Sequence, residues 1–126
     1  RSLPNLDHIK MKIFKEFTFE AAHKLPLVPR DHKCSNLHGH SFRVRIYIDG
    51  PLNEFGWVMD FSELKKICAP YIKQLDHSYL NEIPGLENPT SENIAIWLWN
   101  NLIEHLQNLS SIEVMETCNS GCEYSG

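Results

Sequence analysis

The chain has 126 residues and a net charge of −4 at pH 7, with 42% hydrophobic and 22% charged residues. This length suits one domain with its own core, and so small a domain is a natural candidate for oligomerisation. The acidic balance argues against nucleic-acid binding, which needs a basic face. No apolar run approaches the roughly 20 residues of a membrane span.

Residues 1–10 carry charges and no apolar block, so we expect no signal peptide and a cytoplasmic location. Met11 is a plausible natural start. Residues 1–10 are therefore interpreted as an N-terminal arm or a tag remnant, and residues 11–126 as a single domain. Without an export signal the cysteines are expected to be thiols, and the Cys-x-x-x-Cys spacing at 118 and 122 is attributed to chance. The cysteines are Cys34, Cys68, Cys118 and Cys122.

Two long strands are predicted in the first half of the chain. Residues 11–23 form one, since Phe17, Phe19, Ala21 and His23 fall on one face at a period of two. Residues 24–37 read as a loop, and residues 38–49 alternate most clearly between apolar and polar side chains. Gly50-Pro51 ends this strand, and residues 56–59 are expected to form a short third strand.

The second half predicts two helices and a last strand. Asp60-Phe61-Ser62-Glu63 has the spacing of a capping box, and Pro70 should kink or split the helix that begins there. Pro89-Thr90-Ser91-Glu92 opens a second helix whose apolar residues follow a period near 3.6. Residues 111–118 read as a strand. The order predicts an α+β fold, an antiparallel sheet with helices packed on one face.

Three histidines fall where they can share a metal ion. His38 and His40 begin the second strand two residues apart, so they point to the same side, and His23 ends the first strand. If the two strands are antiparallel neighbours, all three lie together on the helix-covered side of the sheet. Three imidazoles with an open fourth position are typical of catalytic zinc. A structural zinc with Cys34 as the fourth ligand is the main alternative.

Proton-transfer groups are expected near this site. Cys34 lies four residues before His38, and a nearby zinc ion would favour its thiolate, which can act as a general base or a nucleophile. An inert thiol is the alternative. Asp76 and His77 form a carboxylate–imidazole pair at the end of the first helix. Adjacent residues rarely contact each other, so the pair can equally be a polar helix terminus.

Glu116 shares the apolar parity of Ile112 and Val114, and therefore points inward. Buried carboxylates are rare unless they are paired. A carboxylate in this position suits the N–H edge of a guanine-like heterocycle, from which it can accept two hydrogen bonds. Thr90 and Ser91 can add further hydrogen bonds, or only cap the second helix.

Together these motifs resemble the 6-pyruvoyl-tetrahydropterin synthase family over nearly all of residues 12–126. The matching segments are Phe19-Glu20-Ala21-Ala22-His23, Cys34-x-x-x-His38-Gly39-His40, Leu75-Asp76-His77, Pro89-Thr90-Ser91-Glu92-Asn93 and Glu116-Thr117-Cys118. The resemblance implies the tunnelling fold, a four-stranded antiparallel sheet with two helices on one face. It also implies a homohexamer, a dimer of trimers with sites at the subunit interfaces.

The resemblance further implies a role for each site residue. Zinc would be held by His23, His38 and His40. Glu116 would anchor a pterin ring with help from Thr90 and Ser91. The catalytic residues would be Cys34 as the base, the Asp76–His77 dyad, and Glu116.

The implied reaction belongs to a zinc-dependent lyase. The three-residue spacing from Cys34 to His38 resembles the bacterial carboxy branch of queuosine biosynthesis. That branch converts 7,8-dihydroneopterin triphosphate to 6-carboxy-5,6,7,8-tetrahydropterin, and releases acetaldehyde and triphosphate. The pyruvoyl branch and a non-catalytic pterin- or purine-binding module are the alternatives. Ser125 stands where relatives often have Arg, so the triphosphate contacts stay open, with the basic residues of loop 24–37 as candidates.

Overall fold

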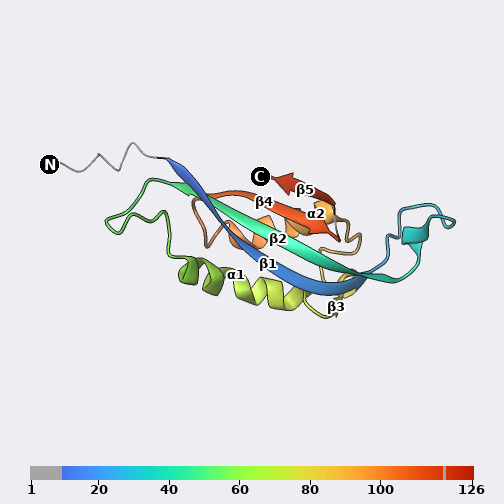
Figure 1. Ribbon diagram of the computed structural model, residues 1–126. Helices are drawn as coiled ribbons and strands as arrows, with labels where there is room; N and C mark the ends of the chain where they lie inside the picture. The colour runs from blue at the N-terminus through green and yellow to red at the C-terminus, as the bar shows by residue number, and fades with distance from the viewer. Residues whose placement is uncertain (1–9, 118) are drawn as a thin grey trace.

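The computed structural model describes residues 10–117 and 119–126, which form a sheet covered by two helices (Figure 1). The sheet order is β3-β1-β2-β4-β5. All neighbouring strands are antiparallel except β3, which runs parallel to β1. The bounds are β1 Met11–His23, β2 His38–Gly50, α1 Phe61–Leu75, β3 Ser78–Tyr79, α2 Ser91–Leu102, β4 Leu109–Glu116 and β5 Ser120–Tyr124. The predicted α+β class is confirmed, and the two-residue β3 makes the sheet five-stranded and mixed.

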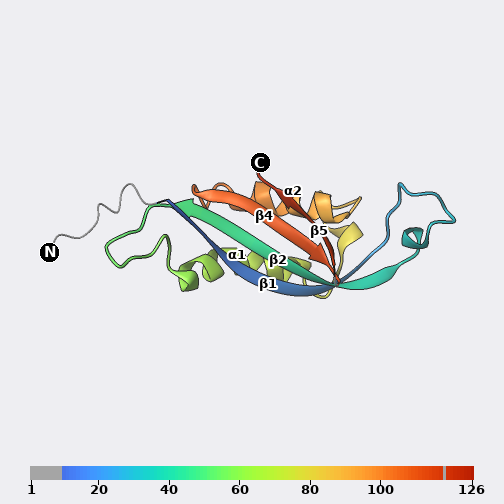
Figure 2. The same ribbon diagram turned by 45° about the horizontal axis from the view of Figure 1, so that its top comes forward.

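β1 and β2 form the longest pairing in the sheet, as both views of the ribbon show (Figures 1 and 2). Their register runs from Met11 opposite Gly50 to His23 opposite His38 without a bulge. On the helix-covered face the buried apolar positions are Phe19, Ala21, Phe42, Val44, Ile46 and Ile48. On the other face most side chains are polar, and the Arg45 guanidinium donates to Glu16 at 2.8 Å and lies over the ring of the exposed Phe14. The alternation of apolar and polar residues predicted from the sequence therefore corresponds to the helix-covered face and the opposite face of the sheet.

Both helices begin where the sequence predicts. The Asp60 carboxylate accepts from the Ser62 N–H at 2.8 Å, and the Thr90 hydroxyl accepts from the Asn93 N–H at 3.1 Å. These side chains satisfy backbone donors that have no partner in the first turn of a helix. Pro70 lies within α1, which nevertheless continues from Phe61 to Leu75, so the expected split does not occur. Within the described residues, neither helix is long and apolar enough to cross a membrane.

The predicted third strand at residues 56–59 is wrong. The Asn53 side-chain oxygen accepts from the N–H groups of Phe55 and Trp57, and the Asn53 N–H donates to the Trp57 carbonyl. The segment thus satisfies its backbone groups locally, as Asn-initiated turns do. The last predicted strand ends at Glu116, and residue 118 lies outside the described residues, as do residues 1–9, so the Cys118–Cys122 spacing has no structural account.

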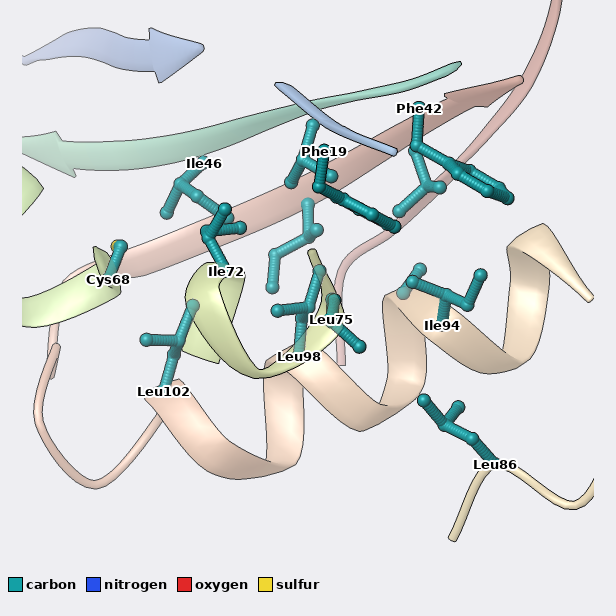
Figure 3. Packing of buried hydrophobic residues seen from close by; sticks show 14 of the residues in the cluster. Phe19, Phe42, Ile46, Cys68, Ile72, Leu75, Leu86, Ile94, Leu98 and Leu102 are labelled. Atoms are coloured by element: carbon teal, nitrogen blue, oxygen red, sulfur yellow. The ribbon is translucent and has the colours of Figure 1, made fainter. Parts of the chain in front are cut away.

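The core fills the space between the sheet and the two helices (Figure 3). Phe19 of β1 stacks on Phe42 of β2 with ring centroids 4.8 Å apart, and both rings are fully buried. Leu98 of α2 is buried in the same cluster. Cys68 of α1 is a free thiol in this core, and burial raises its pKa to about 12. Cys68 therefore acts as a small apolar residue, as most buried thiols do.

Candidate metal and ligand site

The three predicted histidines meet at one end of the sheet. His23 ends β1, His38 begins β2 directly opposite it, and His40 follows two residues later on the same side. The ring centroids are 4.6 Å apart for His23 and His38, 5.2 Å for His23 and His40, and 4.7 Å for His38 and His40. One nitrogen of each ring lies within 4.8 Å of the other two, so the cluster can hold a metal ion.

Hydrogen bonds fix which nitrogen two of these histidines offer. The Nδ1 atoms of His23 and His38 lie 2.7 Å from the carbonyl oxygens of Pro89 and Asn36 respectively. A carbonyl can only accept, so each Nδ1 carries a proton, and in the neutral imidazole Nε2 is then the atom with a free lone pair. The Nε2 atom of His23 is buried and has no hydrogen-bond partner among the described residues. A metal ion held by the cluster would give this buried polar atom a partner.

The electrostatics of His23 agree with this assignment. Desolvation lowers the pKa of His23, and the neighbouring His38 adds to the effect. The ring is therefore neutral near pH 7, which is the protonation state that binds a metal. The residues present thus fit a metal ion by burial and by protonation state.

His40 completes the cluster in a different setting. Its Nδ1 lies 3.2 Å from the Thr117 hydroxyl, and its Nε2 lies 4.0 Å from a carboxylate oxygen of Glu116. Among the described residues, neither Cys34 nor a carboxylate belongs to the three-histidine cluster. Three imidazoles without a fourth protein ligand leave one position free for a substrate or water. Thr117 lies in the segment Glu116-Thr117-Cys118 that carries part of the family resemblance, but no pattern in the sequence assigns it a role.

Glu116, Thr90 and Ser91 are brought together, as predicted. The Ser91 hydroxyl donates to Glu116 Oε1 at 2.7 Å, whereas Thr90 caps α2. The Glu116 side chain is 29% exposed, and its other oxygen faces His40. The three residues line one hollow of about 370 Å³, together with Leu25, Glu92, Ser120 and Gly121. This hollow therefore presents a carboxylate to a ligand directly beside the three-histidine cluster.

Asp76 and His77 contact each other although they are adjacent in the chain. His77 Nδ1 lies 2.9 Å from Asp76 Oδ2, because His77 takes a backbone φ of 56°. The main chain of Glu20 holds both residues: its N–H donates to Asp76 Oδ1 at 2.9 Å, and its carbonyl accepts from the His77 N–H at 2.6 Å. The bond from Glu20 is the largest cause that lowers the pKa of Asp76, so this carboxylate is ionised.

The single chain does not bring every predicted residue into one hollow. The His77 side chain is 79% exposed and lines a hollow with Glu20 and Ser41 of the sheet face opposite the helices, and His40 of the histidine cluster and Thr117 line the same hollow. Cys34 lies in the 3-10 turn Lys33–Ser35, where its N–H donates to His32 Nδ1 at 3.0 Å and its thiol is half-buried. Cys34 and His77 thus lie outside the hollow that holds Glu116.

Comparison with known proteins agrees with the fold and with the motifs. Residues 12–126 match the family model of 6-pyruvoyl tetrahydropterin synthase. The chain is similar to a 6-carboxy-5,6,7,8-tetrahydropterin synthase from Synechocystis, with 50% identity over 119 residues that cover 89% of this chain and 91% of that protein. It is also similar to an enzyme of the same name from Haemophilus influenzae, with 35% identity over 139 residues and coverage of 90% and 97%.

A solved structure shows the same fold. The 6-pyruvoyl tetrahydropterin synthase of Caenorhabditis elegans superposes with a TM-score of 0.86 at 24% identity, covering 94% of this chain and 96% of that one. The family match spans the three histidines, Cys34, the Asp76–His77 pair and Glu116. The chain belongs to the 6-pyruvoyl tetrahydropterin synthase family.

Proposed function

We propose that this protein is a zinc-dependent 6-carboxy-5,6,7,8-tetrahydropterin synthase. It converts 7,8-dihydroneopterin triphosphate to 6-carboxy-5,6,7,8-tetrahydropterin and releases acetaldehyde and triphosphate, a step of queuosine and 7-deazapurine biosynthesis. The observation that carries the proposal is the open three-histidine cluster directly beside the inward Glu116. Two relatives similar over about nine-tenths of the chain carry this enzyme's name.

Zinc would be held by the Nε2 atoms of His23, His38 and His40. When bound, it supplies a Lewis acid that polarises the oxygens of the substrate side chain. The protein holds these ligands in place through the carbonyls of Pro89 and Asn36, which prevent the first two rings from turning.

The pterin ring would bind in the hollow lined by Glu116, Ser91 and Thr90. The Glu116 carboxylate accepts hydrogen bonds from the N–H groups on the pyrimidine edge of the pterin. The Ser91 hydroxyl, which donates to Glu116 Oε1, fixes the direction of the carboxylate. This arrangement orients the substrate so that its side chain extends towards the histidine cluster.

Proton transfer would fall to Cys34 and to the Asp76–His77 dyad. In this proposal the Cys34 thiolate removes a proton from the substrate side chain, and His77 exchanges protons while Asp76 stabilises its protonated form. The dyad faces the side of the sheet opposite the helices and is exposed in the single chain. A site completed by a second copy accounts for this separation, in a homohexamer built as a dimer of trimers.

The direct test is to incubate the zinc-loaded protein with 7,8-dihydroneopterin triphosphate and to measure acetaldehyde and the 6-carboxy product. Formation of both supports the proposal. Release of triphosphate without acetaldehyde would assign the chain to the pyruvoyl branch instead. Binding of a pterin without any turnover would identify a non-catalytic binding module.

A further inference from the structure

The three histidines differ in what holds their Nδ1 atoms. His23 and His38 are held by main-chain carbonyls, which accept hydrogen bonds and never donate them. His40 is held by the Thr117 hydroxyl, which can do either. The tautomers of the first two rings are therefore set by the backbone, whereas that of His40 depends on one side chain.

The fold places the Thr117 hydroxyl at this ring. Thr117 follows the last residue of β4, and its N–H donates to the Ser41 carbonyl at 3.1 Å, which extends the β2–β4 pairing by one step. Because Ser41 is the neighbour of His40, this bond keeps residue 117 beside the imidazole. Glu116 and Thr117 thus contact the two sides of the same ring, with Glu116 Oε2 4.0 Å from Nε2 and Thr117 Oγ1 3.2 Å from Nδ1.

Two hydrogen-bond arrangements are available to His40. When the Thr117 hydroxyl accepts from Nδ1–H, the lone pair of Nε2 faces the cluster and can bind a metal. When the hydroxyl donates to Nδ1, Nε2 carries the hydrogen and can point it towards Glu116. In that second arrangement His40 offers no lone pair to the metal, so the site loses one of its three ligands.

We propose that Thr117 is a positioning residue of the metal site, whose hydroxyl holds His40 in the tautomer that binds zinc through Nε2. This inference rests on the proposed zinc site and extends it to a residue outside the ligand set. Outer partners of metal-binding histidines typically change metal affinity by about 10- to 100-fold when they are removed. Thr117 is exposed, so the loss of its hydroxyl leaves the core intact.

The test compares zinc affinity across substitutions at this position. Zinc dissociation constants are measured by competition with a chromophoric chelator for the parent, Thr117→Val, Thr117→Ala and Thr117→Ser. Val removes the hydroxyl and keeps the shape of the side chain, whereas Ala removes the hydroxyl and shortens the side chain, and both are expected to weaken binding by about 10- to 100-fold. Ser keeps the hydroxyl and is expected to restore the parental affinity. Thr18→Val, on an exposed position of β1, is the matched control and should bind zinc as the parent does.

Thermal unfolding of the metal-free forms checks that each variant is folded. If Thr117→Val and Thr117→Ala bind zinc as tightly as the parent does, the inference about Thr117 is wrong and the proposed zinc site is unaffected. The same holds if Thr117→Ser binds as weakly as Thr117→Val, because a hydroxyl at this position would then not be enough to hold His40. Failure of the parent to bind zinc overturns the proposed function, and the inference with it.

Discussion

Removal of the metal should lower the free energy of unfolding of this protein by an amount that can be worked out from the site. In the metal-free chain the buried His23 Nε2 has no partner among the described residues, and such an atom costs about 1–3 kcal/mol. A metal ion that binds only the folded state stabilises it by about 2.7 kcal/mol when its free concentration is 100 times its Kd. Both effects favour the metal-bound folded chain, so a measurable shift is expected.

The stabilisation converts to a temperature through the size of the chain. For 126 residues, an unfolding entropy of about 2.1 cal/mol/K per residue gives roughly 0.26 kcal/mol/K in total. Each kcal/mol then changes Tm by about 4 °C, and zinc at 100 times its Kd should raise Tm by about 10 °C. Calorimetry at one fixed protein concentration, with and without a chelator, measures this shift.

Two histidine variants decide whether the shift comes from the cluster. His38→Ala removes one half-buried ligand, so zinc should then raise Tm by only a small part of the parental amount. His105→Ala removes a histidine that is bonded to Tyr71 outside the cluster, and should keep the full shift. No shift in the parent, or the same shift in His38→Ala, would refute the reasoning.

Three further outcomes are expected. Cys34→Ala should keep its zinc, by metal analysis, and lose about 10²- to 10⁴-fold in acetaldehyde release, whereas loss of zinc would make Cys34 a ligand. Glu116→Gln should weaken pterin binding by about 10- to 150-fold, because hydrogen bonds to a charged group contribute roughly 1.5–3 kcal/mol. A fluorescence titration measures this affinity, and an unchanged value would contradict the anchor role. The folded state lowers the pKa of Asp76, so the ionised carboxylate stabilises the fold at pH values above the ordinary carboxyl pKa of about 3.9. This stabilisation is lost as the pH falls through the lowered pKa. The stabilities of the parent and Asp76→Asn in urea should therefore converge as pH falls from about 5 to 3, and a gap that does not change with pH would contradict this.

The histidine cluster could be predicted because it depends on strand geometry alone. Side chains on a strand alternate between faces, so His38 and His40 had to share a side, and an antiparallel partner placed His23 beside them. The inward direction of Glu116 follows from the same parity, since it lies opposite the buried Phe42. The alternation of side chains along the strands was therefore enough to predict most of the fold and the centre of the site.

The parts that were not predicted depend on contacts between distant segments. β5 is a short polar strand with a glycine, which weakens any strand signal. A Cβ at Gly121 would lie 2.7 Å from the Val114 carbonyl, so the glycine permits close approach to β4. The Asp76–His77 contact needs a positive φ at a residue other than glycine, and the main chain of Glu20 on another strand holds it there. No local pattern contains that information.

The uninterrupted β1–β2 register has a consequence for how this site can vary. The distance between His23 and His38 is set by the sheet and not by the fourteen-residue connection, 24–37, between them. Lengthening a loop costs little, because closure entropy grows only with the logarithm of its length. Insertions that move Cys34 relative to the metal would leave the ligands where they are. The strand register thus fixes the histidine cluster, whereas the loop that carries Cys34 can change in length and sequence without moving it.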